Sequence, residues 1–193
     1  MGKVWKQGQV VIDNLKEKIL DHKSSKTGYM IKSFLSDCPD WETLLKCLAF
    51  ESLQDGSFFD SVIPPNNGES RIGTVIHRGL YFNVNLKEDT MLKYIPTAHK
   101  AMEEIRDRTN FNLSLSGIKI SMAPYDVVPH KDKWDGMALQ LQGVSSWVVS
   151  DPDSDYSEEF ILEPGDFLFF PVECLHSVVS TNPRATAIIG VSI

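Results

Sequence analysis

The sequence predicts a mainly β domain, an antiparallel sandwich or barrel, with flanking α-helices on its N-terminal side. Residues 113–193 alternate short apolar runs with turn signals, a cadence typical of antiparallel strands. Residues 1–112 carry helical periodicities interrupted by Pro and Gly clusters. The 193 residues fit a single domain, in which we expect residues 1–112 to give helical and strand support and residues 113–193 to form the core strands.

Two helices are expected near the N-terminus. Apolar residues stand at helical spacing from Val10 to His22, with Lys and Glu between them. Asp40 is a candidate N-cap for a second helix, WETLLKCLAFESL, in which Leu44, Leu45 and Leu48 would face inward.

The middle of the chain mixes a loop, strands and helices. The Pro- and Asn-rich segment Phe58–Ser70 predicts a surface loop and a candidate lid. The run RIGTVIHRGLYFNVN predicts one or two strands. Residues Asp89–Asp107 are expected to be helical in two pieces, because Pro96 disfavours a helical residue before it and suits the first turn of the second piece.

The C-terminal part of the chain predicts a series of short strands. The runs are LSLSGIKISMA, MALQLQ, WVVS, FIL, FLFF, HSVVS and ATAIIGVSI. Pro164-Gly165-Asp166 precedes FLFF as a turn leading into a buried strand, and the β-branched content of the last run indicates another.

Composition limits the classes of partner. With 19 basic and 26 acidic side chains the formal charge is -7, which disfavours a broad polyanion-binding face, so no nucleic-acid partner is expected. Three cysteines without a C-x-x-C pair indicate neither a disulfide framework nor a cysteine zinc site. No stretch approaches the length of a membrane span. We therefore expect a soluble, cytoplasmic protein without a membrane partner; its oligomeric state is left open.

His130, Asp132 and His176 have the composition of a metal site. Two imidazoles and one carboxylate are the ligands of the facial triad that holds Fe(II) with open coordination positions. His130 and Asp132, at i and i+2 on an extended segment, would point to one side of a sheet. His176 follows 44 residues after Asp132, at the end of an apolar run. The sequence thus predicts three ligands of one metal ion.

These residues stand within two segments that resemble a known family. HKDKWDGMALQLQGVSSW and ILEPGDFLFFPVECLHSV resemble the JmjC-type hydroxylases among the 2-oxoglutarate and Fe(II)-dependent oxygenases. The second segment is also similar to a cupin motif, with Glu173 where Gly is usual. The resemblance covers roughly the C-terminal third of the chain. It implies a double-stranded β-helix (a cupin or jelly-roll core) whose mouth holds the metal.

One position departs from the JmjC pattern. Ser145 stands where those enzymes usually carry the Lys or Arg that holds the far carboxylate of 2-oxoglutarate. Arg184 and Thr186 instead form an Arg-x-Thr pattern like that of prolyl-hydroxylase-like oxygenases, which implies that they hold this carboxylate. Arg offers a planar bidentate fork suited to it. Lys119 is the next candidate for the anchor.

Three further residues are candidates to line the site. Tyr125 and Gln140 are expected to border the cosubstrate pocket, and Trp134 follows the metal pair closely enough to wall the substrate channel. No catalytic residue is expected beyond the metal ligands.

The resemblance implies a hydroxylase with Fe(II), 2-oxoglutarate and O2 as cofactor and cosubstrates. A protein or peptide side chain is favoured as the primary substrate, and a small metabolite or free amino acid is the alternative. Two rivals keep the three ligands: a cupin that binds a metal or ligand without turnover, and a metal-dependent cupin isomerase. Neither of these two proteins needs a cation to bind a dicarboxylate, so Arg184 is the residue that distinguishes the oxygenase from both.

Overall fold

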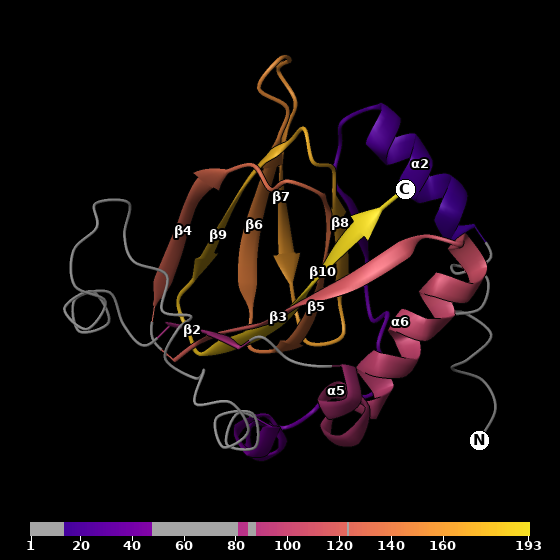
Figure 1. Cartoon of the computed structure of the whole chain (residues 1–193). Helices are drawn as coiled ribbons and strands as arrows, with labels where there is room; N and C mark the ends of the chain where they lie inside the picture. The colour runs from indigo at the N-terminus through magenta and orange to yellow at the C-terminus, as the bar shows by residue number, and fades with distance from the viewer. Residues whose placement is uncertain (1–13, 48–80, 85–87, 123) are drawn as a thin grey trace.

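A computed structural model describes residues 14–47, 81–84, 88–122 and 124–193. These form a double-stranded β-helix, two antiparallel sheets packed face to face (Figure 1). The strands are β1 (Tyr29–Ile31), β2 (Tyr81–Val84), β3 (Asn112–Ser121), β4 (Tyr125–His130), β5 (Asp135–Gln142), β6 (Ser145–Ser150), β7 (Ser157–Leu162), β8 (Phe167–Phe170), β9 (Leu175–Ser180) and β10 (Arg184–Ser192). The larger sheet has the order β1-β8-β5-β10-β3-β2, and the smaller has the order β4-β9-β6-β7.

The helices lie on the outside of the larger sheet, away from the smaller one (Figure 1). They are α2 (Leu15–Ser24), α5 (Glu88–Tyr94) and α6 (Pro96–Thr109), and residues 41–47 are also helical. The predicted break at Pro96 is confirmed, since Pro96 opens α6. The predicted cap is confirmed as well, because the backbone N–H of Thr43 donates to Asp40 Oδ1 at 2.7 Å. The inward placement of Leu45 was wrong, because this side chain is exposed, whereas Leu44 is buried as expected. Leu48 lies outside the described residues.

Alternation along the central strands gives the larger sheet two different faces. In β10 the side chains of Ala185, Ala187 and Ile189 join the apolar layer beneath the helices. Ile188, one residue out of step, joins the second apolar cluster between the two sheets. Because successive side chains of a strand point to opposite faces, Arg184 and Thr186 share the inner face with Ile188.

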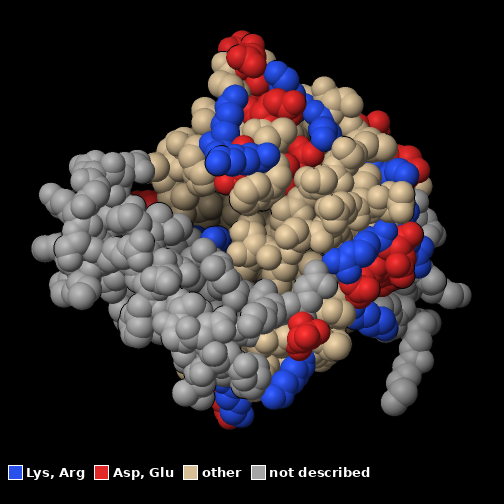
Figure 2. Space-filling view, in the orientation of Figure 1, with Lys and Arg blue, Asp and Glu red and all other residues tan. Residues whose placement is uncertain are grey.

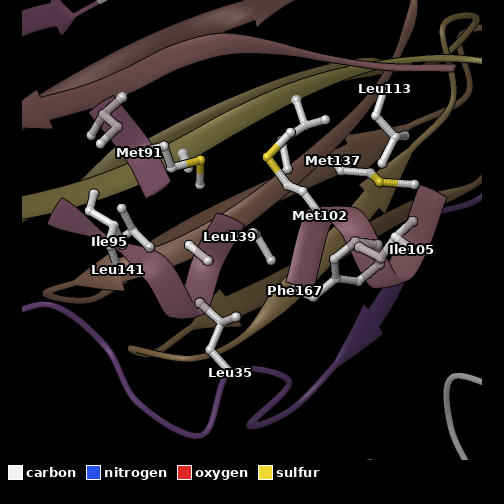
Figure 3. Packing of buried hydrophobic residues seen from close by; sticks show 14 of the residues in the cluster. Leu35, Met91, Ile95, Met102, Ile105, Leu113, Met137, Leu139, Leu141 and Phe167 are labelled. Carbon is white, nitrogen blue, oxygen red and sulfur yellow. The ribbon is translucent and has the colours of Figure 1, made fainter. Parts of the chain in front are cut away.

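The outer layer is the larger of the two cores. The helical side of this layer is formed by Met91 of α5, by Ile95, which follows α5, and by Met102 and Ile105 of α6. These side chains pack against Met137, Leu139 and Phe167 of the sheet (Figure 3). Burying an aliphatic side chain of this size stabilises the fold by about 1.5 to 3 kcal/mol. The helices therefore hold the larger sheet from outside and leave its inner face for other side chains.

Two strands were not among the predicted apolar runs. Strand β1 has three residues, too few to show a period, and it pairs with β8. Strand β4 contains Pro129, which interrupts its pairing with β9 between Val127 and His130. The predicted Phe58–Ser70 loop lies outside the described residues.

Basic and acidic side chains are interspersed over the projecting β6–β7 connection and over α6, with few charges on the surface between them (Figure 2). Within the described ranges, no helix has the length and apolar character needed to cross a membrane.

Candidate metal centre and cosubstrate site

The three predicted ligands come together at one end of the space between the sheets. His130 ends β4 and is the register partner of His176 on β9. Asp132 lies two residues beyond the end of β4, in the connection to β5, so the expectation that it shares a strand with His130 was wrong. One donor atom from each residue lies within 4.8 Å of the other two. The predicted grouping is present.

The donor atoms face a common gap. Asp132 Oδ1 lies 3.8 Å from His130 Nε2, and Asp132 Oδ2 lies 3.7 Å from His176 Nε2. Both distances exceed those of hydrogen bonds, so the donors are held near each other without bonding to each other. Two imidazole nitrogens and a carboxylate converging in this way fit a divalent transition metal.

A backbone carbonyl orients the His130 ring so that its Nε2 is directed to the metal centre. Its Nδ1 lies 2.9 Å from the carbonyl oxygen of Val128. A carbonyl can only accept, so Nδ1 carries the hydrogen and donates it. Nε2, the atom that faces Asp132, is then the nitrogen available to a metal, as in metal-bound histidines whose second nitrogen is held by a carbonyl.

His176 is buried among aromatic rings. Its ring centroid lies 4.4 Å from that of Phe170 and 6.1 Å from that of Trp147. Burial, with a smaller contribution from His130, lowers the pKa of His176 to about 3, so the ring is neutral at neutral pH. Burial also raises the pKa of Asp132, while His130 and Lys119 oppose that shift. A bound cation would stabilise the carboxylate that burial disfavours.

The centre opens towards His130. The side chains of His130, Asp132 and His176 are 42%, 24% and 5% exposed. His176 thus closes the inner side, and His130 borders solvent.

Asp135 ties together the two segments that carry the ligands. This buried carboxylate accepts the backbone N–H of Val172 at 3.0 Å and the ammonium of Lys23 at 2.7 Å. Asp135 follows Asp132 by three residues, and Val172 precedes His176 by four. The bond between Asp135 and Val172 therefore positions both segments. The sequence offered no signal for it, because the partner is a backbone group far along the chain.

A chain of hydrogen bonds runs along the inner face of the larger sheet. Arg184, 2% exposed, donates from Nη1 to Thr186 Oγ1 at 3.1 Å. Thr186 Oγ1 donates to Gln140 Oε1 at 2.9 Å, and Ser145 Oγ donates to the same oxygen at 3.0 Å. Trp147 Nε1 in turn donates to Ser145 Oγ at 3.0 Å. Ser145, at the position where JmjC enzymes carry a cation, is here part of the support for Arg184 and Thr186.

The backbone at Gly143 brings the chain close to Arg184. Gly143 has a φ of +69°, and a Cβ there would lie 2.0 Å from the carbonyl oxygen of Pro183. Only glycine fits this conformation and this approach. Gln140 Nε2 donates to the carbonyl oxygens of Gln142 and Gly143 at 2.8 and 3.2 Å, which fixes the orientation of its amide.

The remaining predicted residues separate into two groups. Gln140 and Thr186 lie inside and are fully buried. Trp134 is 39% exposed and lies against Gly190, at the other end of β10 from Arg184. The backbone of Tyr125 pairs with Ser180, but its side chain lies outside what the structure describes.

Comparisons with known proteins agree with the fold. No family model matches the sequence, and no curated protein matches it significantly. A prolyl hydroxylase from Trichoplax adhaerens, in complex with a hypoxia inducible factor oxygen degradation domain peptide fragment, has a TM-score of 0.63 at 13% identity, over 99% of this chain and 94% of that chain. The fold is that of the 2-oxoglutarate and Fe(II) oxygenases.

Two further solved structures are similar. An oxidoreductase of the 2OG-Fe(II) oxygenase family from Burkholderia pseudomallei has a TM-score of 0.54 at 13% identity, over 92% of this chain and 89% of that chain. YcfD, a ribosomal oxygenase from Escherichia coli, has a TM-score of 0.55 at 19% identity, and the match covers 92% of this chain but only 51% of the YcfD chain. At these identities the likeness concerns the fold, and the function has to be argued from the site.

Proposed function

We propose that this protein is an Fe(II)- and 2-oxoglutarate-dependent dioxygenase that hydroxylates a C–H bond, with a protein or peptide side chain as its substrate. The observation that carries the proposal is that a three-donor metal site at the smaller sheet and a buried arginine on the inner face of the larger sheet are both built into one barrel. A metal-binding cupin without turnover needs the first of these and has no use for the second. A cosubstrate with a metal-chelating end and a distant carboxylate needs both.

Each residue has a role that its surroundings support. His130, Asp132 and His176 would hold Fe(II), which supplies the oxygen chemistry with 2-oxoglutarate and O2 when bound. Arg184 would bind the distal carboxylate, and Thr186 would orient the guanidinium by accepting a hydrogen bond from its Nη1. His176 keeps its ring neutral, and the rings of Phe170 and Trp147 exclude water from that side. His130 faces the mouth, where a primary substrate would enter.

The preference for a protein substrate rests on two of the similar structures. One was solved with a peptide fragment, and another is described as a ribosomal oxygenase. We extend this class of substrate to the present chain as part of the proposal. A small metabolite or free amino acid is the competing outcome.

The test combines binding and turnover. The purified protein is titrated anaerobically with Mn(II) and then 2-oxoglutarate, followed by measurement of succinate release with Fe(II), O2 and a peptide library. We expect saturable 2-oxoglutarate binding only in the metal-loaded protein, succinate formation, and peptides that gain the mass of one oxygen atom. Asp132→Ala serves as the inactive control. A protein that binds Mn(II) but never 2-oxoglutarate would support the non-catalytic cupin and contradict the proposal.

A further inference from the structure

Lys119 is a second basic residue on the inner face that carries Arg184. Strand register pairs Lys119 on β3 with Thr186 on β10, and Thr186 with Gln140 on β5. Directly paired residues of antiparallel strands present their side chains on the same face of a sheet. Lys119, Thr186 and Gln140 therefore form a row across three strands, facing the smaller sheet. Ile118 and Ile120, on either side of Lys119, join the outer apolar layer, as this alternation requires.

The row of Lys119 lies between Arg184 and the metal ligands. One step along the strands in one direction is the pair formed by Arg184 and Ser121. In the other direction, past Ile188, lies the row formed by Gly190, Gly136 and Phe170. The ring centroid of Phe170 lies 4.4 Å from that of the metal ligand His176. Lys119 is thus nearer to the metal site than Arg184 is.

The electrostatic surroundings of Lys119 agree with this position. Burial and the charge of Arg184 lower its pKa to about 8, while Asp132 acts in the opposite direction. Lys119 therefore interacts with the metal ligand on one side and with the buried guanidinium on the other. Among the described residues, its ammonium forms no ion pair within 4.0 Å. A half-buried cation so placed is compensated best by an anion that enters the same space.

We propose that Lys119 binds the carboxylate of 2-oxoglutarate that lies beside the metal, so that the site offers one cation to each end of the dianion. This inference rests on the proposed function and adds to it a residue that recognises the 2-oxo acid group. The planar guanidinium of Arg184 suits a carboxylate that offers both of its oxygens. The ammonium of Lys119 is a compact charge and suits a carboxylate of which one oxygen would bind the metal and only the other would be available.

The two cations then recognise different parts of the ligand. Arg184 distinguishes a 2-oxo diacid from a 2-oxo monoacid, because only the diacid reaches it. Lys119 contributes equally to both ligands, because both carry the carboxylate beside the keto group. Two ligands and two variants separate these roles.

The experiment is calorimetric titration of the Mn(II)-loaded protein with 2-oxoglutarate and with 2-oxobutyrate, which lacks the distal carboxylate. Lys119→Met should weaken both ligands by a similar factor, about 10- to 100-fold, the range expected for one charge-assisted hydrogen bond. Arg184→Gln should weaken 2-oxoglutarate by at least as much and leave 2-oxobutyrate nearly unchanged. Lys119→Arg, which keeps the charge, should recover part of the loss. Lys18→Met makes the same chemical change on the exposed side of α2 and should alter neither affinity.

Each other outcome overturns the inference. If Lys119→Met weakens the binding of 2-oxoglutarate alone, Lys119 binds the distal carboxylate together with Arg184. If it weakens the binding of neither ligand, the residue is structural. Circular dichroism and Mn(II) affinity show whether each variant is folded and loaded, and Lys119→Arg provides the test should Lys119→Met fail to fold. A wild-type protein that holds Mn(II) but binds neither oxo acid would instead contradict the proposed function itself.

Discussion

The metal end and the arginine end of the barrel interior are built in different ways. At the metal end the ligands come from a strand terminus, a connection and a neighbouring strand, and the His130 side chain is 42% exposed. At the other end Arg184 is 2% exposed and is held by Thr186, a residue of the same central strand. The open end suits a reaction that must admit a large substrate. The closed end suits a ligand whose negative charge pairs with a cation held in one fixed position.

The largest expected effect is at the metal end. Asp132→Ala should weaken Mn(II) or Fe(II) binding by well over 100-fold, since even the loss of a residue that merely supports a ligand costs 10- to 100-fold. Metal affinity and circular dichroism are measured together. Asp126→Ala, on the exposed side of β4, is the control and should bind metal normally. Stoichiometric iron in Asp132→Ala would exclude this carboxylate as a ligand.

The second effect separates the two ends. Arg184→Ala should weaken 2-oxoglutarate binding by roughly two orders of magnitude or more, because losing one member of a buried ion pair costs about 3 to 5 kcal/mol. Metal affinity should change far less, since the triad does not use this side chain. Arg184→Lys should recover only part of the loss, because an ammonium lacks the fork. Unchanged 2-oxoglutarate affinity in Arg184→Ala would make Lys119 the anchor.

A smaller effect concerns the backbone beneath Arg184. Gly143→Ala places a methyl group against the Pro183 carbonyl oxygen in a left-handed conformation, and should destabilise the protein by about 1 to 3 kcal/mol. We expect 2-oxoglutarate affinity to fall and metal affinity to persist, as measured by urea unfolding and two titrations. The neighbouring exposed Val144→Ala is the matched control. Equal losses of 2-oxoglutarate affinity and metal affinity would show that the arginine end and the metal end are not independent.

The last effect depends on pH. The pKa of Lys119 is lowered from 10.5 to about 8, so the folded protein binds this proton less tightly than the unfolded chain does. The charged lysine therefore lowers stability below pH 8, and this cost fades as pH rises from 8 towards 10.5. Lys119→Met should stabilise the ligand-free protein at pH 7 by about 1 to 3 kcal/mol, and by less at pH 9.5. A gain that is the same at both pH values would contradict this electrostatic origin.

The sequence predicted what depends on local pattern. Turn signals and apolar runs indicated the strands that carry Gln140, His176 and Arg184, and the H-x-D spacing indicated two ligands beside each other. These features need only the periodicity of a strand and the chemistry of the side chains. The metal grouping and the buried arginine followed from them.

Features that depend on register could not be predicted. Lys119 was named as a basic alternative, but its place beside Thr186 follows from the pairing of β3 with β10. Asp135 bonds to a backbone group 37 residues away, and strand β1 is defined only by its pairing with β8. The position of Asp132 beyond the end of β4 depends on where pairing with β9 stops. Such contacts are set by the whole fold.

The hydrogen bonds around Gln140 have a fixed proton order. Trp147 Nε1 and the Arg184 guanidinium can only donate, so the hydroxyls of Ser145 and Thr186 must accept from them and direct their own protons to Gln140 Oε1. The Gln140 amide hydrogens are already committed to backbone carbonyls, so the amide has no equivalent flipped state. The network therefore has one arrangement of hydrogens and a permanent polarity. Its orientation is established on folding, and an arriving carboxylate meets dipoles that need no rearrangement.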